Sequence, residues 1–91
     1  MSTITAQISL YPLAQKDLRP AIQEVWDALT RRGLPTRAGA MSTLTWGETE
    51  QVFEALQEGF QQATKHGSTV MVITVSNACP LPDHEEEPDH A

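Results

Sequence analysis

The sequence contains one cysteine, Cys79, has six basic residues against twelve acidic ones, and lacks a long apolar run. A single cysteine excludes an internal disulfide framework and any two-cysteine metal or redox motif within one chain. The shortage of basic residues argues against nucleic-acid binding through phosphate charge. No apolar stretch approaches the ~20 residues that span a bilayer, and the N-terminus lacks the features of a signal peptide. We therefore expect a cytoplasmic protein that does not insert into membranes.

The acidic residues are unevenly spread along the 91-residue chain, whose formal net charge is −6. Those beyond the last apolar segment are Asp83, Glu85, Glu86, Glu87 and Asp89. A segment with repelling charges, prolines and no apolar anchor is typical of a solvated tail, and the preceding part is close to neutral. The length suffices for one compact domain. We predict that residues 1–80 fold as this domain and that residues 81–91 form an acidic disordered tail.

The first half of the chain predicts a strand followed by a helix. Residues 3–11 alternate, with Ile4, Ala6, Ile8 and Leu10 on one side and Thr5, Gln7, Ser9 and Tyr11 on the other. This period of two indicates a strand with one buried face. Asp17 is a suitable cap for the next segment, and Gly33 is a suitable terminator. Between them, a single helical stripe is formed by Leu18, Ile22, Val25, Trp26 and Leu29.

The second half predicts two short strands, a second helix and a last strand. Residues 36–41 and 43–46 are too close in sequence for a crossover, so we expect an antiparallel pair. Glu48 and Glu50 are placed to open the second helix near its positive end, and Gly67 to end it. Its predicted buried stripe is Val52, Phe53, Leu56, Phe60 and Ala63. Residues 68–77, rich in β-branched side chains, form the last strand.

The resulting order β, α, β, β, α, β defines the fold class. Right-handed crossovers place both helices on the same side of one four-stranded antiparallel sheet. We therefore predict a ferredoxin-like α+β sandwich, in which one sheet face carries no helix. In so small a domain such a face is commonly buried by another subunit, which makes a homo-oligomer the expected assembly.

The strand phases predict which side chains occupy this uncovered face. If Ile4, Ala6, Ile8 and Leu10 point to the helices, then Gln7, Ser9 and Tyr11 point away from them. We assign Thr43 and Thr45 of the third strand to the same outer face, with Leu44 and Trp46 inward, and Thr74 and Ser76 of the last strand outward. An aromatic ring among uncharged hydroxyl and amide groups suits a small, flat, neutral or weakly cationic heterocycle. A polar subunit interface is the alternative reading of the same pattern.

Three segments carry a resemblance to a known family. They are Thr5-Ala6-Gln7-Ile8-Ser9-Leu10-Tyr11-Pro12-Leu13, Gly39-Ala40-Met41-Ser42-Thr43 and Ser76-Asn77-Ala78-Cys79-Pro80. In their order and content they resemble the YkoF-like thiamine- and hydroxymethylpyrimidine-binding proteins, over about residues 3–80. The resemblance implies a ferredoxin-like domain that binds thiamine or its pyrimidine moiety without catalysis and serves vitamin transport or salvage. Some members carry two such domains, so here a dimer or tetramer would supply the pairing.

The motif positions supply the candidate ligand contacts. Amide and hydroxyl groups can pair with the amino group and ring nitrogens of a 4-aminopyrimidine, an aromatic ring can stack on it, and a methionine can line the pocket. The candidate ligand-binding residues are Gln7, Ser9, Tyr11, Met41, Ser42, Thr43, Ser76 and Asn77. We expect no cofactor, metal site or catalytic residue.

Two other readings are weaker. Cys79 could act as a nucleophile, but the nearest base in the folded region, His66, lies at the opposite end of the last strand, roughly 30 Å away at about 3.3 Å per residue. His84 and His90 could hold a metal with the tail carboxylates, although a solvated tail explains that segment better. The competing functional hypothesis is a ferredoxin-like regulatory or interaction module whose open sheet face is only an oligomer interface.

Overall fold

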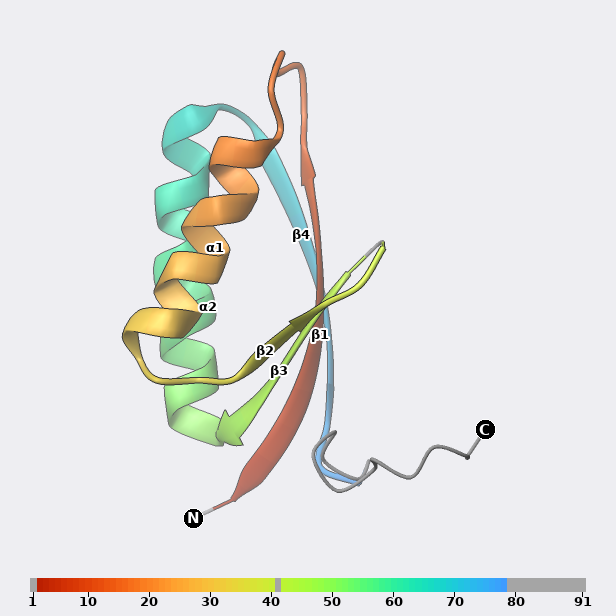
Figure 1. The fold of residues 1–91 in the computed structure, drawn as a ribbon, viewed down its shortest axis with the longest axis vertical. Coiled ribbons are helices and arrows are strands. Elements are labelled where there is room, and N and C mark those ends of the chain that lie inside the picture. The colour runs from red at the N-terminus through yellow and green to blue at the C-terminus, as the bar shows by residue number, and fades with distance from the viewer. Residues whose placement is uncertain (1, 41, 79–91) are drawn as a thin grey trace.

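The computed structural model describes residues 2–40 and 42–78 (Figure 1). Met41, Cys79 and the acidic segment 81–91 lie outside this range, so the predictions made for them stay predictions. The elements are β1 (Thr3–Pro12), α1 (Arg19–Arg31), β2 (Thr36–Ala38), β3 (Thr43–Glu48), α2 (Thr49–Ala63), the 3-10 turn η1 (Thr64–His66) and β4 (Thr69–Ser76). The predicted order of strands and helices is confirmed.

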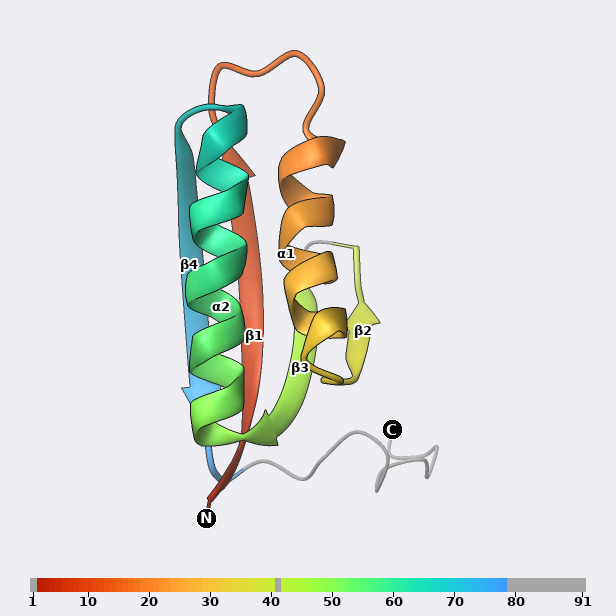
Figure 2. The ribbon, with the colours of Figure 1, turned by 90° about the vertical axis from the view of Figure 1, so that its left-hand side faces the viewer.

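The four strands form one antiparallel sheet in the order β2-β3-β1-β4. Both helices lie on the same side of this sheet, and the other face is uncovered (Figures 1 and 2). The structure is therefore the predicted ferredoxin-like α+β sandwich. β1 and β3 occupy the centre, so β2 and β4 are the two edges. No helix in the part of the chain that the structure describes is long and apolar enough to cross a membrane.

The alternation in β1 builds the floor of the core as predicted. Ile4, Ala6 and Ile8 are buried beneath the helices, while Gln7 and Tyr11 are exposed on the open face. The residues that share the core with these β1 side chains are Ala21, Val25, Leu29, Leu34, Val52, Ala55, Leu56 and Ala63. One strand face and two helix stripes thus converge on a single core.

Small residues set the contact between the two helices. A Cβ atom on Gly59 of α2 would lie only 3.0 Å from the Val25 Cα atom of α1. Because the two helices approach this closely, small alanine side chains are buried on both of them. Two larger residues of the predicted helix stripes lie outside the core. Leu18 precedes α1 and is exposed, and the side chain of Phe53 is 47% exposed. The predicted helices are right, but these two core assignments are wrong.

The ends of α1 follow the predicted chemistry. Asp17 Oδ1 accepts a hydrogen bond from the Arg19 backbone N–H at 3.1 Å, which satisfies a donor that the first turn leaves free. Gly33 adopts the left-handed conformation with φ +72°, and its N–H donates to the Thr30 carbonyl oxygen at 2.9 Å. A residue without Cβ takes this conformation at no steric cost, so the helix ends here.

Candidate functional site

A groove lies beneath α1, between the helix and the sheet. It encloses about 260 Å³. It is lined by Ile8 and Leu10 from β1, Ile22, Val25 and Trp26 from α1, and Gly39, Ala40, Ser42 and Thr43 from the β2–β3 turn and the start of β3. All of these side chains are uncharged, and most are apolar. Because sites for drug-sized ligands enclose roughly 300–1,000 Å³, this groove suits a single small heterocycle.

Trp26 and Thr43 form the polar contact of the groove. The Trp26 Nε1–H donates to the Thr43 hydroxyl oxygen at 3.0 Å. The Thr43 side chain is only 8% exposed, because Thr43 pairs with Ile8 of β1 and shares its helix-facing side. A hydroxyl that accepts from an indole still carries its own proton. The pair therefore fixes the indole ring and leaves Thr43 able to donate to a ligand.

The β2–β3 turn closes one side of the groove. The Gly39 N–H donates to the Ser42 carbonyl oxygen at 2.7 Å, and β2 extends only from Thr36 to Ala38. A Cβ atom on Gly39 would lie 3.2 Å from that same oxygen, so a side chain here would crowd the turn. The short strand and the tight turn bring Gly39, Ala40, Ser42 and Thr43 to the wall of the groove. These four residues belong to one of the three segments that carry the sequence resemblance.

The structure splits the sequence-predicted site residues between two faces. Ser42 and Thr43 line the groove beneath α1. Gln7, Ser9 and Tyr11 lie on the open face as predicted, since they alternate with the buried Ile8. Ser76 shares that face, and its hydroxyl oxygen accepts the Ala78 N–H at 3.0 Å, while Asn77 is exposed just beyond β4. One small ligand cannot contact both sets, because the sheet separates them.

The predicted phase of β3 is wrong. Thr43 and Thr45 face the helices, opposite Ile8 and Ala6, and Leu44 and Trp46 face the open side. Both inward threonines have a partner for the hydroxyl group: Thr43 accepts from the Trp26 indole, and Thr45 Oγ1 donates to the Pro35 carbonyl oxygen at 2.7 Å. Satisfied hydroxyls remove most of the cost of burying them. This leaves the larger Trp46 to cover part of the open face.

Thr74 was predicted to face outward, and the structure confirms it. Thr74 pairs with Gln7 across the β1–β4 ladder, so both side chains project from the open face. The same face carries Tyr11, Val70 and Val72, all of which are exposed. The open face is therefore polar in the middle of the sheet and apolar toward one end of β4.

The titratable groups with shifted pKa values lie away from the groove. The Arg19 guanidinium, hydrogen-bonded to Asp17, lowers the pKa of that carboxyl group. The Glu58 carboxylate accepts from Arg31 at 2.6 Å, and this hydrogen bond lowers the pKa of Glu58, with a smaller contribution from Arg32. Within residues 2–40 and 42–78, no group of three His, Cys, Asp or Glu side chains is arranged to hold a metal ion.

His66 contacts Glu24, whereas Cys79 was the partner considered for it from the sequence. Its Nε2 atom lies 2.9 Å from Glu24 Oε2 of α1, at the end of the fold where η1 follows α2. This contact ties the end of the second helix to α1. It gives His66 a structural role that needs no cysteine.

Trp26 is the groove residue that sequence reasoning missed. Its position in a helical stripe predicts a core side chain, and the structure leaves it half-buried at the rim of the groove. The sequence did contain one indication, because a buried indole N–H requires a hydrogen-bond acceptor. A threonine in the nearby segment 39–43 could supply one, although only the folded chain brings these residues together.

The fold and the groove define a class of protein: small ferredoxin-like domains with an uncharged groove between one helix and the sheet. The model of the YKOF-related family matches residues 3–82, and the chain belongs to this family. The resemblance seen in the three sequence segments is thereby confirmed at the level of the family. A comparison with curated proteins gives no match.

Solved structures share the fold at low sequence identity. A domain of unknown function, DUF77, from Bacillus cereus superposes with a TM-score of 0.76 and 18% identity, covering 93% of this chain and 88% of that one. The hypothetical protein MJ1052 from Methanocaldococcus jannascii gives 0.78 and 16%, covering 89% and 86%. TM0486 from Thermotoga maritima, named as a candidate thiamine biosynthesis/salvage protein, gives 0.76 and 17%, covering 91% and 95%. At these identities the likeness shows the fold alone.

Proposed function

We propose that the protein binds thiamine or its hydroxymethylpyrimidine moiety in the groove beneath α1, catalyses no reaction, and serves vitamin B1 transport or salvage in the cytoplasm. Membership of the YKOF-related family and the thiamine-related name of the Thermotoga maritima neighbour support this ligand class. The observation that carries the proposal is the pairing of Trp26 with Thr43 inside a groove of about 260 Å³.

The polar groups of the groove match the pyrimidine ring. A 4-aminopyrimidine presents ring-nitrogen acceptors beside an amino donor. The Thr43 hydroxyl, which already accepts from Trp26, has one proton to donate to a ring nitrogen. The Ser42 hydroxyl can either donate or accept at the mouth of the groove. Of the ligand contacts predicted from the sequence, the proposal keeps these two, Ser42 and Thr43.

The apolar walls match the faces of the ring. The indole of Trp26 offers a flat surface on which a heteroaromatic ring can stack, and Ile22 and Leu10 line the same groove. Such aromatic contacts contribute about 0.5–1.5 kcal/mol beyond the area they bury. The cationic thiazolium of thiamine gains less from an uncharged groove, so we place it toward solvent. Its approach is favoured by the formal net charge of −6.

The open face is assigned to assembly. Tyr11, Val70 and Val72 are exposed apolar side chains on one surface, and burying them against another copy would remove them from water. We therefore propose a homo-oligomer, either a dimer or a tetramer. Gln7, Ser9, Ser76 and Asn77, predicted from the sequence as ligand contacts, lie on this face or at its end, so the proposal places them away from the bound pyrimidine. The same exposed residues support the second candidate function, an interaction module without a ligand.

Calorimetric titration tests the binding proposal. Thiamine and hydroxymethylpyrimidine should both release or absorb heat on saturable binding, whereas the thiazole alone should bind much more weakly because it lacks the aminopyrimidine. Trp26→Ala should remove most of the affinity, while Trp46→Ala, on the opposite face, is the matched control. No binding or thermal shift with any of the three compounds at millimolar concentration would contradict the proposal and favour the interaction module.

A further inference from the structure

None of the six lysines and arginines of the chain lines the groove beneath α1. All six belong to the part of the chain that the structure describes: Lys16, Arg19, Arg31, Arg32, Arg37 and Lys65. Arg37 is close in sequence to the turn that lines the groove, but it pairs with Leu44 across β2 and β3 and therefore shares the open face with that side chain. A negatively charged ligand thus finds no cation on the groove wall.

The arginines of α1 are already engaged by carboxylates. Arg31 and Arg32 form ion pairs with glutamates of α2, on the far side of the helix from the groove. Arg19 begins α1, three residues before Ile22 of the groove wall, and its Nε–H donates to Asp17 Oδ1 at 3.3 Å. This pairing offsets the charge of the arginine that lies nearest to the groove along the helix.

Asp27, the residue after Trp26, carries a negative charge that no cation offsets. Its carboxylate accepts a hydrogen bond from the Gln23 amide at 2.9 Å, and among residues 2–40 and 42–78 it has no ion-pair partner. Gln23 is three residues before Trp26 and so lies beside it on the helix surface. The hydrogen bond therefore holds the carboxylate on the side of α1 next to the mouth of the groove, where Asp27 is partly buried.

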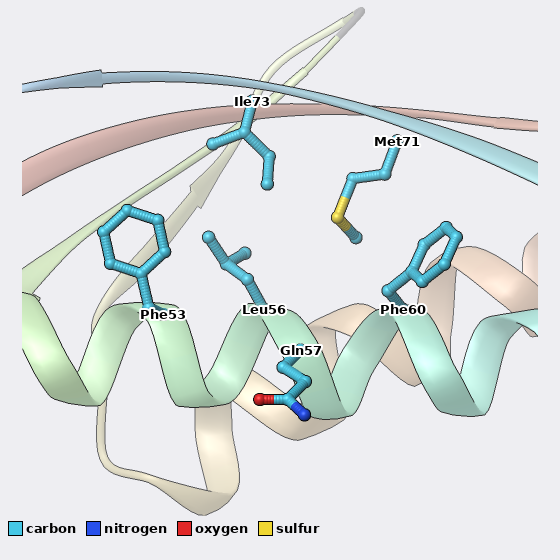
Figure 3. Close-up of a pocket in the computed structure, with 6 residues that line it drawn as sticks. All are labelled: Phe53, Leu56, Gln57, Phe60, Met71 and Ile73. Atoms are coloured by element: carbon cyan, nitrogen blue, oxygen red, sulfur yellow. The ribbon is translucent and has the colours of Figure 1, made fainter.

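Two other hollows of the molecule offer no better place for a phosphate group. A second groove, between α2 and β4, encloses about 450 Å³ and is lined by Phe53, Leu56, Gln57, Phe60, Met71 and Ile73 (Figure 3). Leu56, Met71 and Ile73 point toward one another there, so its interior is apolar. A third hollow, at the start of α2, is lined by Ser2, Glu48, Thr49 and Glu50 and is acidic. Binding of an aminopyrimidine therefore reports on the groove beneath α1.

We infer that this groove selects the unphosphorylated ligand over its phosphate ester, and that Asp27 is a specificity-determining residue. The inference rests on the proposed function. Thiamine, hydroxymethylpyrimidine and hydroxymethylpyrimidine phosphate carry different groups on the same methylene carbon of one aminopyrimidine. These groups are a cationic thiazolium, a neutral hydroxyl and a phosphate of about −1.5 to −2 charges at pH 7. With the pyrimidine in the groove, all three groups lie at its mouth, beside Asp27.

Two effects act against the phosphate ester. Its charged oxygens lose part of their hydration against a wall that supplies no cation, and the Asp27 carboxylate repels them. The same carboxylate attracts the thiazolium of thiamine, and it leaves the neutral alcohol unaffected. Because a partly buried charge is screened less than an exposed one, Asp27 should act on the ligand more strongly than the exposed acidic residues do.

Calorimetric titration of the full chain at low ionic strength tests this inference. The wild type should bind hydroxymethylpyrimidine about tenfold more tightly than its phosphate ester. Asp27→Lys should weaken the binding of thiamine and strengthen that of the ester, each by about fivefold, because the charge at the mouth changes sign. The neutral alcohol should bind both proteins equally. A loss of stability alone would move all three affinities in the same direction.

Glu50→Lys is the matched control, since it changes the net charge by the same amount at an exposed position of α2. It should leave the ratio of the thiamine and ester affinities nearly unchanged. An equal change of this ratio in both variants, or no change in Asp27→Lys, would overturn the role of Asp27. An ester that binds the wild type as tightly as the free alcohol would overturn the selectivity but not the proposed function. Failure of thiamine and hydroxymethylpyrimidine to bind at all would overturn both.

Discussion

The two halves of the molecule, β1-α1-β2 and β3-α2-β4, repeat one unit but end differently. In the first half, the helix leads to a three-residue strand and a tight turn, and Gly39 and Ala40 of this turn line a small groove beneath the helix together with Trp26 and Thr43. In the second half, the helix leads to an eight-residue strand at an uncovered edge, and the groove beside it is apolar. The segment that follows each helix therefore decides the size of the groove beside that helix and which side chains line it.

The largest expected effect comes from forcing the two halves apart. Gly59→Leu places a side chain where even a Cβ atom would lie 3.0 Å from Val25 Cα, so α1 must move away from α2. Overpacking of this kind costs about 1–3 kcal/mol of the free energy of unfolding, which denaturant titration measures. Gln61→Leu on the exposed side of α2 is the control and should change it by less than about 0.5 kcal/mol. Equal stability of the two variants would contradict the close helix contact.

Two threonines of β3, Thr43 and Thr45, test whether the groove beneath α1 binds the ligand. Thr43→Val and Thr45→Val each remove a buried hydroxyl that has a partner, so each should lower the free energy of unfolding by about 1 kcal/mol. Only Thr43→Val should weaken thiamine binding, by about tenfold, because Thr45 bonds to the Pro35 carbonyl and not to the groove. Calorimetry on both variants checks this. Parallel losses of affinity would mean that the effect is one of stability.

The contact between the C-terminal end of α1 and α2 should be sensitive to acid. The hydrogen bond from Arg31 lowers the pKa of Glu58 in the folded protein. A lowered folded-state pKa contributes stability above the unfolded-state value near 4.5, and this stability is lost as the pH falls through the folded pKa. Glu58→Gln should therefore make thermal stability fall less steeply below that pH. Glu54→Gln, which removes one exposed ion pair to Arg32, is the control.

The smallest expected effect distinguishes binding of the pyrimidine in the groove beneath α1 from binding on the open face. Gln7 lies on the open face between Leu44 and Thr74, on the side of the sheet away from α1. Gln7→Ala and Asn77→Ala should therefore leave the affinity for hydroxymethylpyrimidine unchanged in a calorimetric titration. A loss of about 1–3 kcal/mol in either variant would instead place the pyrimidine on the open face, where an amide would pair with it.

The sequence predicted which side of a strand faces the helices where apolar and polar residues alternate clearly, as in β1. It did not do so for β3, where the inward side chains are hydrogen-bonded threonines. The alternation of Ile4, Ala6 and Ile8 with polar residues fixes β1, and the structure agrees. In β3, the apolar Leu44 and Trp46 were predicted to face the helices, and this was wrong. Hydropathy does not show that the hydroxyl groups of Thr43 and Thr45 have hydrogen-bond partners in the core. Those partners, Trp26 and the Pro35 carbonyl, become neighbours only once the helix and the turn are in place.

The candidate site was predictable in part for the same reason. The segment 39–43 was singled out from the sequence, and Ser42 and Thr43 do line the groove. Trp26 was assigned to the core because a helical stripe does not distinguish its centre from its rim. Likewise, Phe53 was placed in the core, while small residues such as Ala55 and Gly59 took the helix contact and left the ring at the edge of the second groove.

Tryptophan fluorescence tests the central claim most directly, because the two tryptophans lie on opposite faces of the sheet. Trp26 lines the groove beneath α1, and Trp46 faces the open side. In Trp46→Phe, which keeps Trp26, thiamine should quench the emission saturably, with the dissociation constant that calorimetry gives for the wild type. In Trp26→Phe, the emission of Trp46 should show no saturable change. Saturable quenching of Trp46, with Trp26 unaffected, would contradict the account and place the ligand on the open face.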